Sequence, residues 1–299
     1  MLINKNRLKN EGVYRMTKSI KILTDSSIQL TPEELKKYSI NVIPLSVEIE
    51  GKTFVDGEDI SRQELIDHLR AGRFPKTSQP ALGKFVEMYD ELGADGSSVL
   101  AIMISDVLSG TCATAQTAAD MTNTEVTVIN SKSTDRGLAY QVIAAAKDLE
   151  AGKSIAEIKK HCLEVHKRTR VNVLIDNLDC LVKGGRVSRL AGTLTKLINL
   201  KVIVELGDKS LDPVVKGRSK KTFVKFCEDL AKRHVDNPIV DLALSHVDPE
   251  PEFIERLKKT ILGEESHVPS LTKLTSPIIM THTGLNAIGV ITLSEKEDL

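Results

Sequence analysis

The chain has 299 residues, which is enough for two modest domains that each bury a hydrophobic core. Its 41 basic and 41 acidic residues balance, and aromatic residues make up only 3% of it, so neither surface charge nor base stacking favours nucleic acid as a partner. The four cysteines are far apart and form no CxxC pair, and we expect them to be reduced thiols of a cytoplasmic protein.

The first residues are polar and do not resemble a signal peptide, and no apolar run in the sequence is long enough to span a membrane. We expect residues 1–18 to be a disordered or non-native extension, with Met16 as the native start. The folded part should therefore begin near residue 19.

Segments typical of strands alternate with segments typical of helices between residues 19 and 169. Three of the helices begin with a capping box, in which Thr31, Ser61 or Ser154 is followed three residues later by Glu. In chain order we predict a strand over Ile20–Ser27, a helix capped by Thr31, a strand over Val42–Ile49 with a hairpin turn at Glu50–Lys52, a helix from Ser61 to near Gly72, a loop over Phe74–Pro80, a helix over Leu82–Leu92, a strand over Ser98–Ile104, a helix over Thr111–Met121, a strand over Val126–Asn130, and helices over Asp135–Ala151 and from Ser154 to near Arg168. Because this alternation is typical of parallel βαβ units, we expect 19–169 to form an open α/β sheet with helices on both faces.

The turn Ser109-Gly110-Thr111 joins a buried strand to a helix. The free N–H groups and the positive end of the helix dipole make such a turn a site for anions, and Gly110 allows a ligand to approach the backbone. Ligands of open α/β sheets bind at the carboxyl ends of the strands, where Asp25 and Ser26 should meet this turn.

The pattern changes after Val171, and we expect 170–297 to form a smaller α/β domain with a mixed sheet and the ligand at the domain interface. In chain order we predict a strand over Val171–Ile175, a loop over Lys183–Ser188, a helix over Leu190–Leu200, a hairpin of Val202–Leu206 with Leu211–Val215, a helix that follows Lys221 and ends near Val235, a strand over Ile239–Ser245, a helix over Glu252–Leu262, a strand over Ser270–Leu274, a polar turn at His282–Gly284 and a strand over Ala287–Leu293.

Several polar residues on loops are candidates for an anion site, and each also has an ordinary structural explanation. Arg186 follows two glycines and suits a carboxylate or phosphate, or it pairs with a surface carboxylate. The hydroxyl residues and His282 could equally be helix caps or a turn residue, and Arg218 could be a solvated helix start. The hydroxyl residues are Thr77, Ser78, Ser109 and Thr111. The sequence has no nucleophile elbow, no nucleotide-binding glycine motif and no metal-ligand spacing, so we predict no catalytic residue, cofactor or metal.

Five loop motifs occur together and in order. They are TSQPA at Thr77–Ala81, LSGT at Leu108–Thr111, GGRVS at Gly184–Ser188, KGRSKK at Lys216–Lys221 and HTG at His282–Gly284. With the opening strand IKILTDSS, this set resembles the DegV family of bacterial fatty-acid-binding proteins from about Ser19 onward. The combination is specific, whereas any single motif would not be.

The resemblance implies a two-domain α/β carrier that encloses one long-chain fatty acid and has no catalytic activity of its own. It implies a partner, the catalytic subunit of an ATP-dependent fatty acid kinase, which would turn the presented carboxylate into an acyl phosphate for phospholipid synthesis. It also implies a transient contact with the membrane surface. By the same resemblance, the carboxylate would be held by Thr77, Ser109 and His282 near Arg186, with Ser78, Gly110, Thr111 and Gly284 around it, and Arg218 would lie at the kinase-docking surface or the pocket rim.

The sequence departs from the family pattern at three places. Ala81 stands where Ser is common, Cys112 replaces an aromatic residue, and Leu285-Asn286 replaces Pro-Gly after the histidine motif. These changes bear on acyl selectivity or kinase pairing more than on the class of ligand. Two other readings stay open: an enzyme related in fold to dihydroxyacetone kinase subunits, with His282 holding a small carbonyl substrate, and a regulatory module that senses a lipid.

Overall fold

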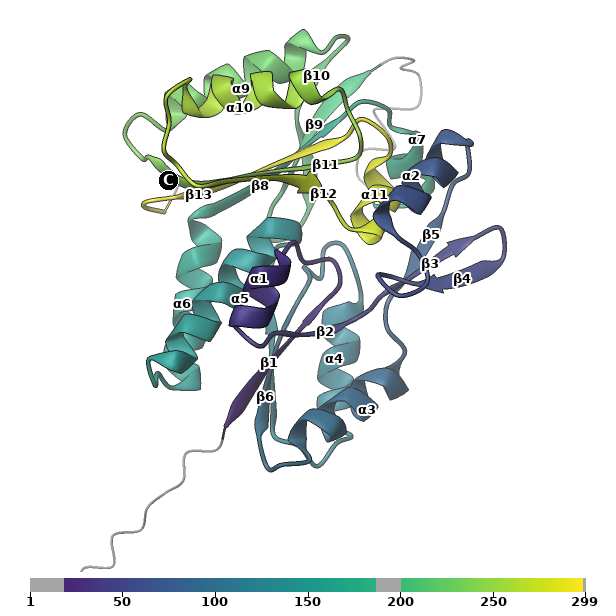
Figure 1. Cartoon of the computed structure of the whole chain (residues 1–299), viewed down its shortest axis with the longest axis vertical. Coiled ribbons are helices and arrows are strands. Elements are labelled where there is room, and N and C mark those ends of the chain that lie inside the picture. Colours follow the sequence, from purple (N-terminus) through teal and green to yellow (C-terminus); the bar gives the residue numbers. More distant parts are fainter. Residues whose placement is uncertain (1–18, 187–199, 298–299) are drawn as a thin grey trace, which may run out of the picture.

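A computed structural model describes residues 19–186 and 200–297 of the chain. These residues form three sheets (Figure 1): a four-stranded sheet in the lower part of the view, a six-stranded sheet in the upper part, and a three-stranded sheet at the right. The expectations for residues 1–18 and for a helix over Leu190–Leu200 fall almost entirely outside the described residues.

The four-stranded sheet is parallel throughout, with the order β2-β1-β6-β7. Its strands are β1 (Ile20–Asp25), β2 (Asn41–Ile43), β6 (Ser98–Met103) and β7 (Val126–Asn130). One face packs on α5 (Asp135–Glu150) and α6 (Ile155–Lys167), and the other on α3 (Leu82–Gly93) and α4 (Thr111–Ala119). The alternating apolar side chains of β1 and β6 supply both cores, which confirms the predicted open sheet with helices on both faces.

The three predicted capping boxes are confirmed. Thr31 caps α1 (Pro32–Lys37), Ser61 caps α2 (Arg62–Arg70) and Ser154 caps α6. In each case the side-chain oxygen accepts from the backbone N–H of the glutamate three residues later, whose carboxylate accepts from the cap backbone in return. These signals are local, so they needed no knowledge of the tertiary structure.

Two predictions around the three-stranded sheet are wrong. The predicted strand Val42–Ile49 is split at Pro44, which has no N–H to donate, into β2 of the parallel sheet and β3 (Ser46–Ile49). The predicted hairpin is confirmed, because β3 pairs antiparallel with β4 (Lys52–Val55). The expected loop after Phe74 contains β5 (Lys76–Ser78), which pairs with the other edge of β3. That pairing is tertiary, so the loop composition did not reveal it.

The six-stranded sheet is mixed, as predicted. Its order is β10-β9-β8-β13-β11-β12, and only the β11–β12 pair is parallel. The strands are β8 (Thr169–Ile175), β9 (Lys201–Leu206), β10 (Leu211–Gly217), β11 (Ile239–His246), β12 (Ser270–Leu274) and β13 (Ile288–Ser294). Helices α9 (Lys221–Arg233) and α10 (Pro251–Leu262) cover its outer face (Figure 1). Its other face turns toward the rest of the chain.

The expected polar turn at His282 is wrong. This residue lies in the last turn of α11 (Pro277–Thr283), which begins with Ser276 as cap and Pro277 at its first position. Gly284 ends the helix with a positive φ of 74°. Helix α11 contacts the short α7 (Asp179–Lys183). Within 19–186 and 200–297, no helix is both long and apolar enough to cross a membrane.

Candidate functional site

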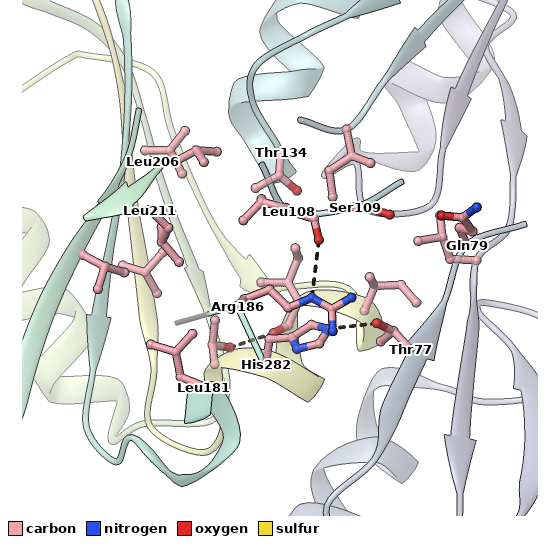
Figure 2. Close-up of a pocket in the computed structure, with 18 of the residues that line it drawn as sticks. Thr77, Gln79, Leu108, Ser109, Thr134, Leu181, Arg186, Leu206, Leu211 and His282 are labelled. Carbon is pink, nitrogen blue, oxygen red and sulfur yellow. Dashed lines mark hydrogen bonds between the residues drawn. The ribbon is translucent and has the colours of Figure 1, made fainter. Parts of the chain in front are cut away.

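A cavity of about 300 Å³ lies between the parallel sheet and the inner face of the mixed sheet. Figure 2 shows Thr77, Gln79 and Ser109 on one side of it, Leu206 and Leu211 on the other, and Arg186 and His282 between them. Its lining residues are Leu45, Thr77, Ser78, Gln79, Ile104, Leu108, Ser109, Gly110, Thr134, Val171, Val173, Ile175, Leu181, Arg186, Val204, Leu206, Leu211, Ile278, Ile279, His282 and Thr283. Its volume is at the lower end of the range for small-molecule sites.

The mixed sheet gives the cavity an aliphatic wall. Val171, Val173 and Ile175 alternate along β8, so all three point to the inner face of the sheet. Val204 and Leu206 of β9 extend the wall, while Leu174 and Ile203 of the same two strands pack with the helices of the outer face. An apolar chain laid on this wall would therefore be removed from water along most of its length.

The side chains of Thr77 and His282 meet at the polar side of the cavity. Thr77 Oγ1 and His282 Nε2 are 2.8 Å apart (dashed line in Figure 2), although 205 residues separate them. The other face of the ring lies against Gly184, where a Cβ would be only 2.3 Å from Nδ1. Only glycine allows α7 to end this close to the imidazole.

His282 is neutral at physiological pH. Burial, and then the charge of Arg186, lowers the pKa of its imidazole to about 3. Its Nδ1 is buried without a hydrogen-bond partner in the described part of the chain. We therefore assign the proton to Nε2, which donates to Thr77 Oγ1. This arrangement leaves the Thr77 hydroxyl hydrogen free to donate into the cavity.

Arg186 supplies the positive charge of the site. It is half-buried, and its burial lowers the pKa of the guanidinium, which nevertheless stays protonated at any physiological pH. Nε donates to Leu108 O at 3.4 Å (dashed line in Figure 2), and Nη1 donates to Gly184 O at 2.6 Å. Since a guanidinium has five N–H groups, these bonds fix the side chain and leave donors for a ligand. No other fully charged side chain is among the described residues of the lining.

The turn before α4 contributes Ser109 and Gly110 to the lining. Ser109 Oγ and Thr111 Oγ1 are 2.8 Å apart, and Ser109 Oγ also accepts from the Thr111 N–H. A Cβ on Gly110 would lie 2.3 Å from Gln79 Oε1, so this glycine makes room for the Gln79 side chain. Thr111 itself is buried in α4 and does not line the cavity.

The structure brings six of the nine candidate residues to the cavity. They are Thr77, Ser78, Ser109, Gly110, Arg186 and His282. Thr111 and Gly284 do not line the cavity. Thr111 begins α4 and Gly284 ends α11, next to the lining residues Gly110 and Thr283. Arg218 is exposed between β10 and α9, outside the lining.

We expected Asp25 and Ser26 to meet the turn Ser109-Gly110-Thr111 at the ligand site, but neither residue lines the cavity. The carboxylate of Asp25 is fully buried and accepts from the backbone N–H groups of Ser27 and Ile104, while burial raises its pKa. Asp25 therefore joins the ends of β1 and β6, and it does not face the cavity. Ser26 lines a different cleft.

Sequence reasoning missed the aliphatic wall and three polar lining residues, Gln79, Thr134 and Thr283. The wall could have been found from the alternation in Val171–Ile175, which leaves one apolar face to be covered. Gln79 belongs to the TSQPA motif. Thr134 gave no local signal: it precedes α5 without capping it, and its Oγ1 is buried and unpartnered in the described structure.

Comparison with known proteins gives a consistent result. A family profile described as "Uncharacterised protein, DegV family" matches residues 19–295. A DegV domain-containing protein of Staphylococcus aureus (strain COL) is 38% identical over 282 residues, which are 94% of this chain and all of that protein. Two similar crystal structures are those of DegV, a fatty acid binding protein from Bacillus subtilis (TM-score 0.81, 26% identity, 93% of this chain and 100% of that one), and of a stearic acid-binding protein from Eubacterium ventriosum (TM-score 0.80, 25% identity, 94% and 100%).

Proposed function

This chain belongs to the DegV family, and from that membership and the form of its cavity we propose that it binds one long-chain fatty acid. The observation that carries the proposal is the division of the cavity into an aliphatic wall and a polar side. The acyl chain lies against Val171, Val173 and Val204, and the carboxylate lies among the polar side chains. That division matches the two parts of a fatty acid. The solved relatives named as fatty acid and stearic acid binders support the same ligand class.

The tail accounts for most of the affinity in this proposal. Each buried methylene contributes about 0.8 kcal/mol, so a tail of roughly sixteen carbons contributes on the order of 12 kcal/mol before the costs of association are subtracted. A hydrogen bond to a charged group contributes about 1.5–3 kcal/mol. The head-group residues therefore fix the position of the carboxylate more than they determine total affinity.

The head-group chemistry suits an ionised carboxylate. Arg186 provides the compensating charge, and the hydroxyls of Thr77 and Ser109 provide neutral donors. Because His282 is neutral, it adds no second charge, and its role is to hold the Thr77 hydroxyl in place. One fixed cation and oriented hydroxyls leave part of the carboxylate free to react.

We further propose that the bound carboxylate is presented to a separate ATP-dependent fatty acid kinase in the cytoplasm, which converts it to an acyl phosphate for phospholipid synthesis. Arg218 is exposed and outside the cavity lining, which suits a docking residue. In a reaction reconstituted with such a kinase, Arg218→Glu should slow acyl phosphate formation and leave fatty acid binding unchanged. If binding falls in step with transfer, Arg218 belongs to the pocket.

Binding is tested with delipidated protein and two ligands of equal tail length, palmitic acid and hexadecanol. We expect saturable one-to-one binding of palmitic acid and weaker binding of the alcohol, which lacks the charged group. Failure of both ligands to bind would contradict the proposal. Turnover of a small carbonyl compound without any kinase would favour the enzyme reading instead.

A further inference from the structure

A small pouch adjoins the cavity in which we propose that the fatty acid binds. Its volume is about 20 Å³, and five residues line both spaces: Thr134, Val171, Val173, Ile279 and Thr283. A space of this size holds one water molecule or one methyl group. The pouch is therefore a side extension of the cavity and not an independent site.

The floor of the pouch is Gly289 on strand β13. Gly289 pairs with Val173 on one side and with Ser245 of β11 on the other, so a row of side chains along the inner face is interrupted at this position. The backbone does not require glycine here, because Gly289 is outside the left-handed region and a Cβ would meet Ser245 O at 3.4 Å, a tolerable contact. Glycine inside a strand weakens it and often marks the close approach of a ligand.

Three hydroxyl groups around the pouch donate their hydrogens within the protein, so they offer a water molecule only acceptor lone pairs. The hydroxyls of Ser245 and Thr275 both donate to the carboxylate of Asp135, and Thr283 Oγ1 donates to Ile279 O. A water molecule needs two to four polar partners, and Thr134 Oγ1 is the one unpartnered side-chain oxygen among the described lining residues. The pouch therefore suits an apolar occupant better than a water molecule.

We propose that the pouch over Gly289 is a subsite that takes one apolar carbon of the acyl chain, so that Gly289 determines which fatty acids the protein selects. The inference rests on the proposed fatty acid binding. The apolar carbon could be either of two parts of a fatty acid: the terminal methyl of a straight chain or a methyl branch. The missing side chain at Gly289, between Val173 and Ser245, gives either one its space.

The test compares wild type with Gly289→Ala, whose added methyl fills the pouch. Delipidated protein is offered a mixture of straight saturated acids from myristic to stearic acid and their iso-branched isomers, and the bound acids are extracted and quantified. The control is Ile288→Val, which alters the same strand on the face that packs against the outer helices. A second variant, Ile291→Val, enlarges the pouch from its wall and carries the test if Gly289→Ala does not fold.

We expect Gly289→Ala to lower the relative uptake of one group of acids about fourfold, the equivalent of about 0.8 kcal/mol for one buried carbon. Loss of the longest straight acids identifies the terminal methyl as the occupant, and loss of the branched isomers identifies the branch. Ile291→Val should shift uptake in the opposite direction, and Ile288→Val should not shift it. An unchanged ratio, or an equal loss for every acid, overturns the inference. If wild type takes up no acid at all, the proposed function fails as well.

Discussion

Replacing Thr77 with valine tests the head-group arrangement most sharply. Valine has the same shape and suits strand β5, but it removes the hydroxyl that lies 2.8 Å from His282 Nε2. Because Nδ1 has no partner in the described structure, the variant leaves both ring nitrogens unpaired in a buried site. We expect the free energy of unfolding of the ligand-free protein to fall by about 1–3 kcal/mol.

The same substitution removes a donor to the bound carboxylate. A hydrogen bond to a charged group contributes about 1.5–3 kcal/mol, so the dissociation constant for palmitic acid should rise roughly 10- to 150-fold. The measurement is a calorimetric or fluorescence titration of the delipidated variant with palmitic acid and hexadecanol. Thr117→Val is the matched control, since that exposed threonine bonds only within its own helix. An unchanged palmitic acid affinity, or an equal loss for both ligands, would refute the reasoning.

Two further predictions concern groups at the site, and a third concerns Asp56, a buried carboxylate that follows β4 and lines the separate cleft of Ser26. Arg186→Gln removes the one fully charged side chain among the described residues of the lining. In the same titration it should weaken the binding of palmitic acid and leave the binding of hexadecanol nearly unchanged. An equal effect on both ligands would argue against a contact between this charge and the carboxylate. Gly184→Ala should displace the His282 ring and weaken palmitic acid binding. Because both substitutions act on the same contact between Thr77 and His282, the double variant with Gly184→Ala and Thr77→Val should bind no more weakly than Thr77→Val alone. Additive losses of binding free energy in the double variant would contradict this. Burial raises the pKa of Asp56 from 3.8 to about 6. Between these two pH values the native state binds more protons than the unfolded state. The contribution of Asp56 to the free energy of unfolding therefore falls by up to about 3 kcal/mol as the pH rises from 3.8 to above 6. Asp56→Asn should remove that loss in thermal unfolding from pH 4 to 7. The lowered pKa of His282 makes stability rise with pH in wild type and in Asp56→Asn alike, so the difference between their pH profiles reports on Asp56 alone. Identical profiles would refute the raised pKa of Asp56.

The local elements were predictable because their signals are local. Capping residues satisfy the first N–H groups of a helix wherever it is placed, and the continuous apolar run of Ser98–Ile104 already indicates a strand buried on both faces. The predictions failed where distant pairing decided the outcome. Strand β5 forms only because β3 presents an edge to it, and Pro44 separates two strands that belong to different sheets. The prediction of a turn at His282 overlooks Ser276-Pro277, a helix-start signal six residues before it.

The composition of the site was predictable, but its geometry was not. Residue types and loop motifs indicated an anion site, and the resemblance named the ligand class. Nothing in the spacing of Thr77 and His282 shows that they touch, because the contact depends on how β5 and α11 pack. The role of Gly184 was not predictable either. The sequence shows it as a glycine in a loop, whereas the structure shows that it leaves space for the imidazole ring of His282.

The most direct test of the central claim is native mass spectrometry of the protein purified from bacterial cells, followed by extraction and identification of any bound lipid. We predict a one-to-one adduct with the mass of a long-chain fatty acid, which disappears on delipidation and returns when palmitic acid is added. A protein that stays free of adduct both as purified and after addition of palmitic acid and its longer and unsaturated relatives would contradict the account.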